Sequence, residues 1–174
     1  MSAPQALRTS LFANPATFTY AVLDGAAVST LLDHLYADQP EFECLYRGKL
    51  EPDMAEVAPY LVKLEPGHKF TEWLLDNCFG RHWGIFAVTK VEMPAMRKHF
   101  RTFLMVQGPD GKPVYFRYYD PRVLRLYLPT CNEDETAQVY GPVIEYWLED
   151  ETAEKLLRFS VSKMLAQKDD YSIA

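Results

Sequence analysis

The chain has 174 residues, of which 48% are hydrophobic and 14% aromatic, so it can bury one sizeable core and is too short to favour two independent domains. The net charge of -6 is unevenly spread: residues 1–60 carry -5, residues 61–130 carry +5 and residues 131–174 carry -6. No apolar run is long enough to span a bilayer, and the N-terminus lacks the basic-then-apolar order of a signal peptide. We therefore expect one cytoplasmic domain over residues 1–174. The three cysteines, which are odd in number and lack metal-ligand spacing, are expected to be reduced thiols.

Strand and helix patterns alternate along the chain. Runs rich in β-branched and aromatic residues predict strands at 19–23, 42–46, 60–64, 82–88, 114–119 and 143–148. Apolar residues at helical spacing predict helices at 28–35, 70–78 and 93–104, and a further helix that opens at Asp120-Pro121. This alternation predicts an α/β fold, a single layered domain in which helices flank a mixed sheet, with its core at about 19–148.

The last 25 residues also show helical spacing. Thr152 is a candidate N-cap, and the acidic residues before it suit the positive end of a helix dipole. The sequence therefore predicts a C-terminal amphipathic helix at about 152–168, with Phe159 off its apolar face. Two interpretations stay open: the apolar face packs on the domain, or the helix and Phe159 form part of a groove for a partner segment. The predicted apolar face consists of Ala153, Leu156, Leu157, Ser160, Val161, Met164 and Leu165.

The most informative segment is Phe-Arg-Tyr-Tyr-Asp-Pro-Arg-Val-Leu at 116–124. Its Asp120 can accept hydrogen bonds from the first free helix amides, and Pro121 suits the first helical position because it has no amide to leave unpaired. Together with Leu-Asp-Gly-Ala at 23–26 and Arg-His-Trp-Gly-Ile-Phe at 81–86, this segment resembles the effector chaperone or adaptor family of bacterial type VI secretion systems. That family was long described only as a domain of unknown function.

The resemblance covers roughly residues 19–148 and implies a non-catalytic activity. The protein would bind a cognate secreted effector, a toxin, in the producing cell and help to load it onto the spike protein of the secretion machine. No cofactor, metal, nucleic acid or membrane is expected to take part. The resemblance does not supply binding residues.

Those residues are therefore chosen from the sequence itself. Tyrosine and arginine are enriched at interface hot spots, and two arginines lie three apart on the helix that follows Pro121. The predicted partner-binding residues are Tyr118, Tyr119, Arg122, Arg125, Tyr127 and Phe159. The competing interpretations are that at least one of Tyr118 and Tyr119, which alternate across a strand, points into the core and that the arginines pair with the acidic run at 133–135.

Two other classes of function remain open. A small hydrolase or transferase could use Asp24, His82 or Asp120, although both aspartates are better explained as helix caps and no nucleophile, phosphate-loop or dinucleotide motif accompanies them. A nucleic-acid-binding module could use the basic face of the central helix, which carries Arg97, Lys98 and Arg101. The sequence pI of about 5.2 argues against this last interpretation.

Overall fold

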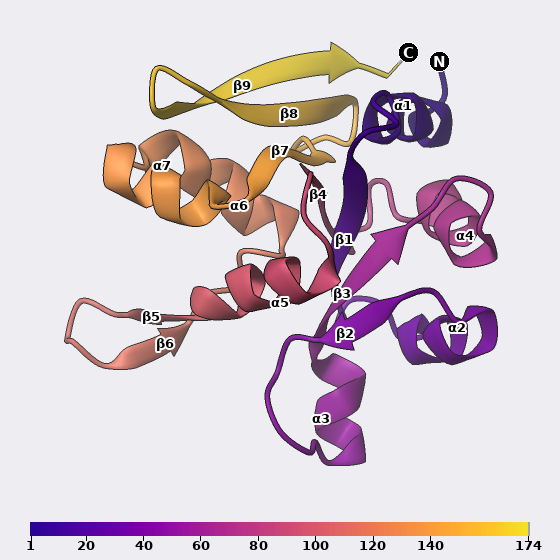
Figure 1. Ribbon diagram of the computed structural model, residues 1–174, viewed down its shortest axis with the longest axis horizontal. Helices are drawn as coiled ribbons and strands as arrows, with labels where there is room; N and C mark the ends of the chain where they lie inside the picture. Colours follow the sequence, from indigo (N-terminus) through magenta and orange to yellow (C-terminus); the bar gives the residue numbers. More distant parts are fainter. Residues whose placement is uncertain (174) are drawn as a thin grey trace.

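A computed structural model describes residues 1–173 and centres on a seven-stranded sheet (Figure 1). The strands run in the order β2-β3-β1-β4-β7-β8-β9, and every neighbouring pair is antiparallel. Their bounds are β1 Phe18–Asp24, β2 Phe42–Cys44, β3 Pro59–Leu64, β4 Gly84–Thr89, β7 Val143–Glu149, β8 Lys155–Ser162 and β9 Leu165–Ser172. The predicted α/β class is confirmed, but the sheet is antiparallel rather than mixed.

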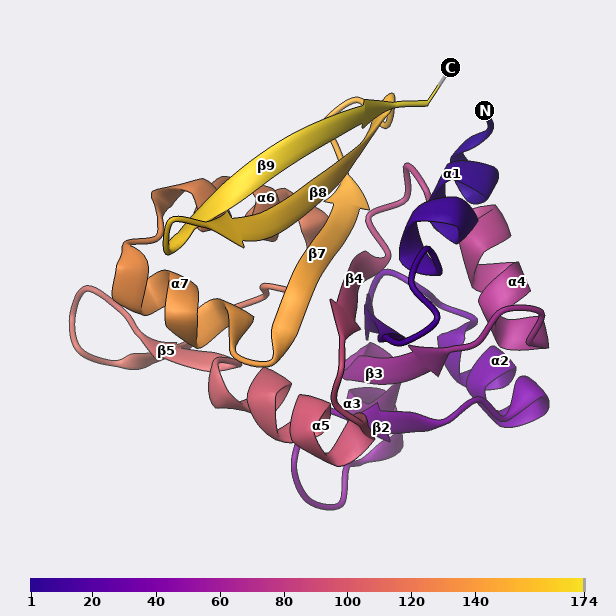
Figure 2. The ribbon, with the colours of Figure 1, turned by 45° about the horizontal axis from the view of Figure 1, so that its top comes forward.

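Helices cover both faces of this sheet (Figures 1 and 2). The helices are α1 Ala3–Leu11, α2 Leu31–Asp38, α3 Pro52–Val57, α4 Lys69–Asn77, α5 Met93–Thr102, α6 Pro121–Tyr127 and α7 Glu133–Tyr140, with a 3-10 turn at Leu128–Thr130. One core contains α1, α2 and α4, and the other contains α5, α6 and α7. Strand β1 is buried from Thr19 onward because Tyr20 and Val22 enter one core while Ala21 and Leu23 enter the other.

A short hairpin of β5 (Met105–Gln107) and β6 (Pro113–Tyr115) projects from the end of α5 (Figure 1). All six strand residues are exposed, including Met105, Val106, Val114 and Tyr115. The strand predicted at 114–119 is thus wrong beyond Tyr115. Residues 116–119 form an irregular connection that leads into α6.

The predicted C-terminal helix at 152–168 is wrong, because β8 and β9 form an antiparallel hairpin there. Leu157 and Phe159 enter the core beneath α6 and α7, whereas Leu156 enters the opposite core, as the two-residue period of a strand requires. Lys163 and Met164 both have positive φ, 49° and 66°, which matches the twist of a tight hairpin turn. The adjacent leucines satisfied the helical period by coincidence.

Candidate functional site

The three sequence segments that carry the family resemblance meet at one end of the central strands. The backbone amide of Asp24, at the end of β1, donates to the carbonyl of Trp83 over 2.9 Å. A Cβ added at Gly84 would lie 2.2 Å from the carbonyl oxygen of Val22, so the close approach of β4 to β1 requires glycine there. The third segment joins them through Arg117, whose guanidinium pairs with the Asp24 carboxylate.

The Asp24–Arg117 pair joins a buried carboxylate to a half-exposed cation. The Asp24 side chain is 3% exposed and the Arg117 side chain 50%. One Asp24 oxygen accepts from the amide of Ala26 at 3.0 Å and the other binds Arg117, whose guanidinium carbon lies 5.9 Å from the centre of the Tyr119 ring. The hydrogen bond to Asp24 is the main reason that the pKa of Arg117 is raised. Asp24 closes a turn here and is not the cap of α2, which begins at Leu31, so the cap expected at Asp24 is wrong.

Asp120 holds a second arginine in the same way, and here the predicted helix cap is confirmed. Its carboxylate accepts a hydrogen bond from the backbone amide of Arg122 at 2.9 Å and two more from the guanidinium of the same residue, at 3.0 and 2.7 Å. Burial alone would raise the pKa of Asp120, but the hydrogen bonds from Arg122 outweigh burial and lower it. The charges of Asp24 and Glu149 also contribute to the raised pKa of Arg122, so the two ion pairs lie within electrostatic reach of each other.

We call these four residues, Asp24, Arg117, Asp120 and Arg122, the arginine corner. In each pair the carboxylate is buried and the guanidinium reaches solvent, with Arg122 55% exposed. A guanidinium fixed in this way loses little conformational freedom when it binds, and its free edge can hold a carboxylate or backbone carbonyls. The arrangement is built to present two oriented cations at the surface.

Glu149 supports this end of the sheet and was missed by sequence reasoning. It is a buried residue at the end of β7, and it accepts from the backbone amides of Gly80 and His82 while contacting the His82 ring. His82 has φ of +56°, so the carboxylate holds a turn with an unusual backbone conformation. No local pattern identifies Glu149, because its partners lie at least 67 residues away in the sequence.

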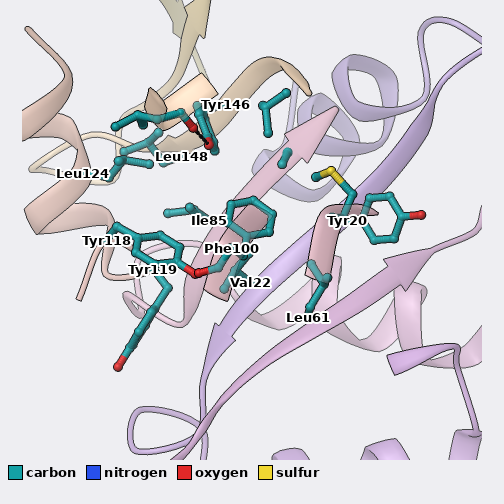
Figure 3. Close-up of a cluster of buried hydrophobic side chains, with 14 of the residues drawn as sticks. Tyr20, Val22, Leu61, Ile85, Phe100, Tyr118, Tyr119, Leu124, Tyr146 and Leu148 are labelled. Carbon is teal, nitrogen blue, oxygen red and sulfur yellow. Dashed lines mark hydrogen bonds between the residues drawn. The ribbon is translucent and has the colours of Figure 1, made fainter. Parts of the chain in front are cut away.

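The six predicted partner-binding residues do not form one surface. Tyr118 and Phe159 are fully buried; Tyr118 stacks on Phe100 and donates its hydroxyl to the Phe100 carbonyl at 2.7 Å (Figure 3). These two side chains belong to the core and not to a docking surface. Tyr119 is also buried, although its hydroxyl points away from the cluster in Figure 3. The guanidinium carbon of Arg117 lies 5.9 Å from the centre of the Tyr119 ring.

The other three predicted residues point in three directions. Arg122 belongs to the arginine corner and pairs with Asp120 rather than with the acidic run at 133–135. Arg125, three residues on, lines a charged hollow of about 300 Å³ with Asp150, Glu151 and Asp170. Tyr127 lines an apolar hollow of about 490 Å³, where it packs edge-on against Phe116 at 4.8 Å.

The residues of the two alternative functions are engaged within the chain. Asp24 and Asp120 are held by arginines, and His82 lies against Glu149. On the central helix, Arg97 pairs with Glu43 at 2.7 Å and Arg101 donates to backbone carbonyls, which leaves Lys98 as the one free cation of that face within residues 1–173.

Across the described chain no three His, Cys, Asp or Glu side chains come together in a way that could hold a metal ion. Nor does any helix within residues 1–173 have the length and apolar character needed to cross a membrane. All three cysteines are free, as expected.

The site lies within a recognised family domain. Residues 19–138 match a family described as "Domain of unknown function (DUF4123)", which is associated with effector adaptors of type VI secretion systems. No curated protein and no solved structure matches the chain. Both arginines of the corner and both of their carboxylates fall inside the matched region, which covers more than half of the sequence. The chain therefore belongs to the DUF4123 family.

Proposed function

We propose that this protein is a non-catalytic adaptor that binds a secreted toxin in the cytoplasm of the producing cell and helps to load it onto the spike protein of a type VI secretion system. The family association supports the class of partner. The observation that carries the proposal is the arginine corner, in which Arg117 and Arg122 are each fixed by a buried carboxylate and left half exposed. Oriented guanidiniums of this kind recur at protein interfaces.

The same geometry favours binding over turnover. A general base needs a carboxylate free to accept a proton from a substrate, whereas Asp120 has a lowered pKa and uses both oxygens on Arg122. Asp24 likewise uses both oxygens, on Ala26 and Arg117. We therefore propose that neither aspartate performs catalysis and that their roles are to orient the arginines.

The test is co-expression with a toxin encoded beside a spike gene in the same locus. The adaptor should raise the soluble yield of the toxin and co-purify with it, because exposed toxin segments would otherwise aggregate. Replacing Arg122 by Gln should weaken the complex by at least about tenfold, as expected for loss of an interface hot spot.

Arg125→Gln is the matched control, because it removes the same charge from the same helix at a position that faces the charged hollow and not the arginine corner. Thermal unfolding of each variant separates lost binding from lost folding. Equal weakening by both substitutions, or no binding of the toxin by the unsubstituted protein, would count against the proposal.

A further inference from the structure

An apolar groove runs between the β5–β6 hairpin and the segment that joins β2 to α3. Its volume is about 340 Å³. Buried Leu45 and Leu104 line the groove, together with the exposed side chains of Met105 and Tyr115 from the hairpin. An isolated two-stranded hairpin has little stability of its own, so exposed apolar residues on both of its strands suit a surface that another chain covers.

The groove is held open by contacts within the chain. Arg101 donates to the carbonyls of Cys44 at 2.8 Å and Leu45 at 3.2 Å, which ties α5 to the connecting segment. Across the groove the ring of Tyr46 lies 5.9 Å from that of Tyr115. A partner would therefore meet a surface that is largely formed in advance, which lowers the entropic cost of binding.

The charge of the groove is positive and uncompensated. Arg47 and Arg101 contribute to its lining, and no acidic residue does. Within residues 1–173 the exposed Arg47 side chain has no hydrogen bond or ion pair, and Arg101 binds only carbonyls. The hollow beside Arg125, by contrast, contains three carboxylates, and the whole chain carries -6.

The groove also lies near the arginine corner. Tyr46 lines the groove and is close enough to Asp24 and Arg117 for their charges to affect its pKa in opposite directions. A single bound segment could therefore contact the groove and then the corner.

We propose that this groove binds an acidic amphipathic segment of the partner protein, whose apolar side chains fill the space between Leu104 and Tyr115 while a carboxylate binds Arg47. The inference rests on the proposed adaptor function and names the chemistry of the segment that the adaptor receives. An apolar face laid in a groove is a common mode of peptide recognition, and an arginine fork gives the carboxylate its position.

The first test uses three synthetic peptides of about 14 residues, roughly four helical turns, that share one apolar face and carry Glu, Gln or Lys at every polar position. Binding to the full chain is measured by fluorescence anisotropy. The Glu peptide should bind at least about tenfold tighter than the Lys peptide, with the Gln peptide between them. Equal affinities, or a preference for Lys, would overturn the proposal. Binding of a single-stranded oligonucleotide in competition with the Glu peptide would also overturn it, because the site would then be a general polyanion surface.

The second test locates the binding site of the peptide on the protein. Arg47→Glu and Tyr115→Ala should each lower the affinity of the protein for the Glu peptide by about tenfold or more. Lys98→Glu makes the same charge change outside the groove, and Leu126→Ala removes an equally exposed apolar side chain from another hollow, so both should bind like the unsubstituted protein. Equal losses in the test and control variants would contradict the assignment.

The toxin complex separates this proposal from the adaptor function itself. If the toxin binds and Arg47→Glu and Tyr115→Ala leave its affinity unchanged, the groove assignment is wrong while the adaptor function stands. If the toxin does not bind the unsubstituted protein, the adaptor function fails first.

Discussion

Arg117 and Asp24 are 93 residues apart in the sequence and form an ion pair at the end of the central strand β1. The carboxylate is buried and the guanidinium is half exposed. The orientation of a surface cation is therefore set by a group that belongs to the interior. The same ion pair therefore contributes to the stability of the domain and to the geometry of its proposed binding surface.

Replacing Arg117 by Met should destabilise the protein, because it leaves the Asp24 carboxylate buried without its counter-charge. The expected loss in the free energy of unfolding is about 1 to 3 kcal/mol, less than for a fully buried pair because Arg117 is half exposed. Urea unfolding measures it. Asp24→Asn keeps the acceptor for the Ala26 amide and removes the charge, so the double variant should lose less stability than the two single losses added together. Strict additivity would show that the pair contributes nothing.

Replacing Asp120 by Ala should cost about 0.5 to 2 kcal/mol, because it removes the cap of α6. Asp120→Asn retains an acceptor for the Arg122 amide and should cost less. The pKa of Asp120 is lower in the folded protein, so its charge contributes stability above the unfolded pKa of about 3.9, and this contribution is lost as the pH falls through the folded value. Chemical denaturation between neutral pH and pH ~3 should show a shallower acid loss in Asp120→Asn than in the unsubstituted protein. Identical acid profiles would contradict this.

Mild acid should destabilise the protein through His99. Burial lowers the pKa of His99 from 6.5 to about 4, against an opposing hydrogen bond to the Val139 carbonyl at 3.0 Å. The unfolded state therefore takes up a proton first, and stability present above pH 6.5 is lost as the pH falls toward 4. Between pH 7.5 and pH 5 the expected loss from this group is about 2 kcal/mol, measured by urea unfolding at each pH.

His99→Gln is the matched variant, because its amide can still donate to the Val139 carbonyl and does not titrate. Its stability should change less between the two pH values than that of the unsubstituted protein. An unchanged pH dependence in this variant would place the acid sensitivity elsewhere.

Phe159→Ala should destabilise the protein strongly, because the side chain of Phe159 is fully buried beneath α6 and α7. Truncating a core phenylalanine costs about 3 to 5 kcal/mol. Val161→Ala, two residues along β8 and about half exposed, should cost far less. Thermal unfolding of the two variants gives the comparison, and a mild effect of Phe159→Ala would favour a surface position for this residue.

Local sequence patterns predicted the helices and strands that are specified by residues close together in the sequence. The alternation of strands and helices through most of the chain follows from apolar periodicity, and the opening of α6 follows from Asp120-Pro121. Helix α7 was missed although a signal was present, since Asn132 and Glu135 form a capping box. The β8–β9 hairpin was mistaken for a helix because Leu156 and Leu157 satisfy both periods, and only pairing with β7 decides between them.

The sequence by itself determined the α/β class, the resemblance to an adaptor family and the importance of the segment at 116–124. The tertiary structure alone decided which of that segment's side chains face outward. Tyr118 and Arg117 are neighbours in the chain, yet one stacks in the core and the other reaches solvent from Asp24. The burial of a side chain and its ion pairs depend on residues that are distant in the sequence and close in the fold. Local sequence patterns therefore do not predict them.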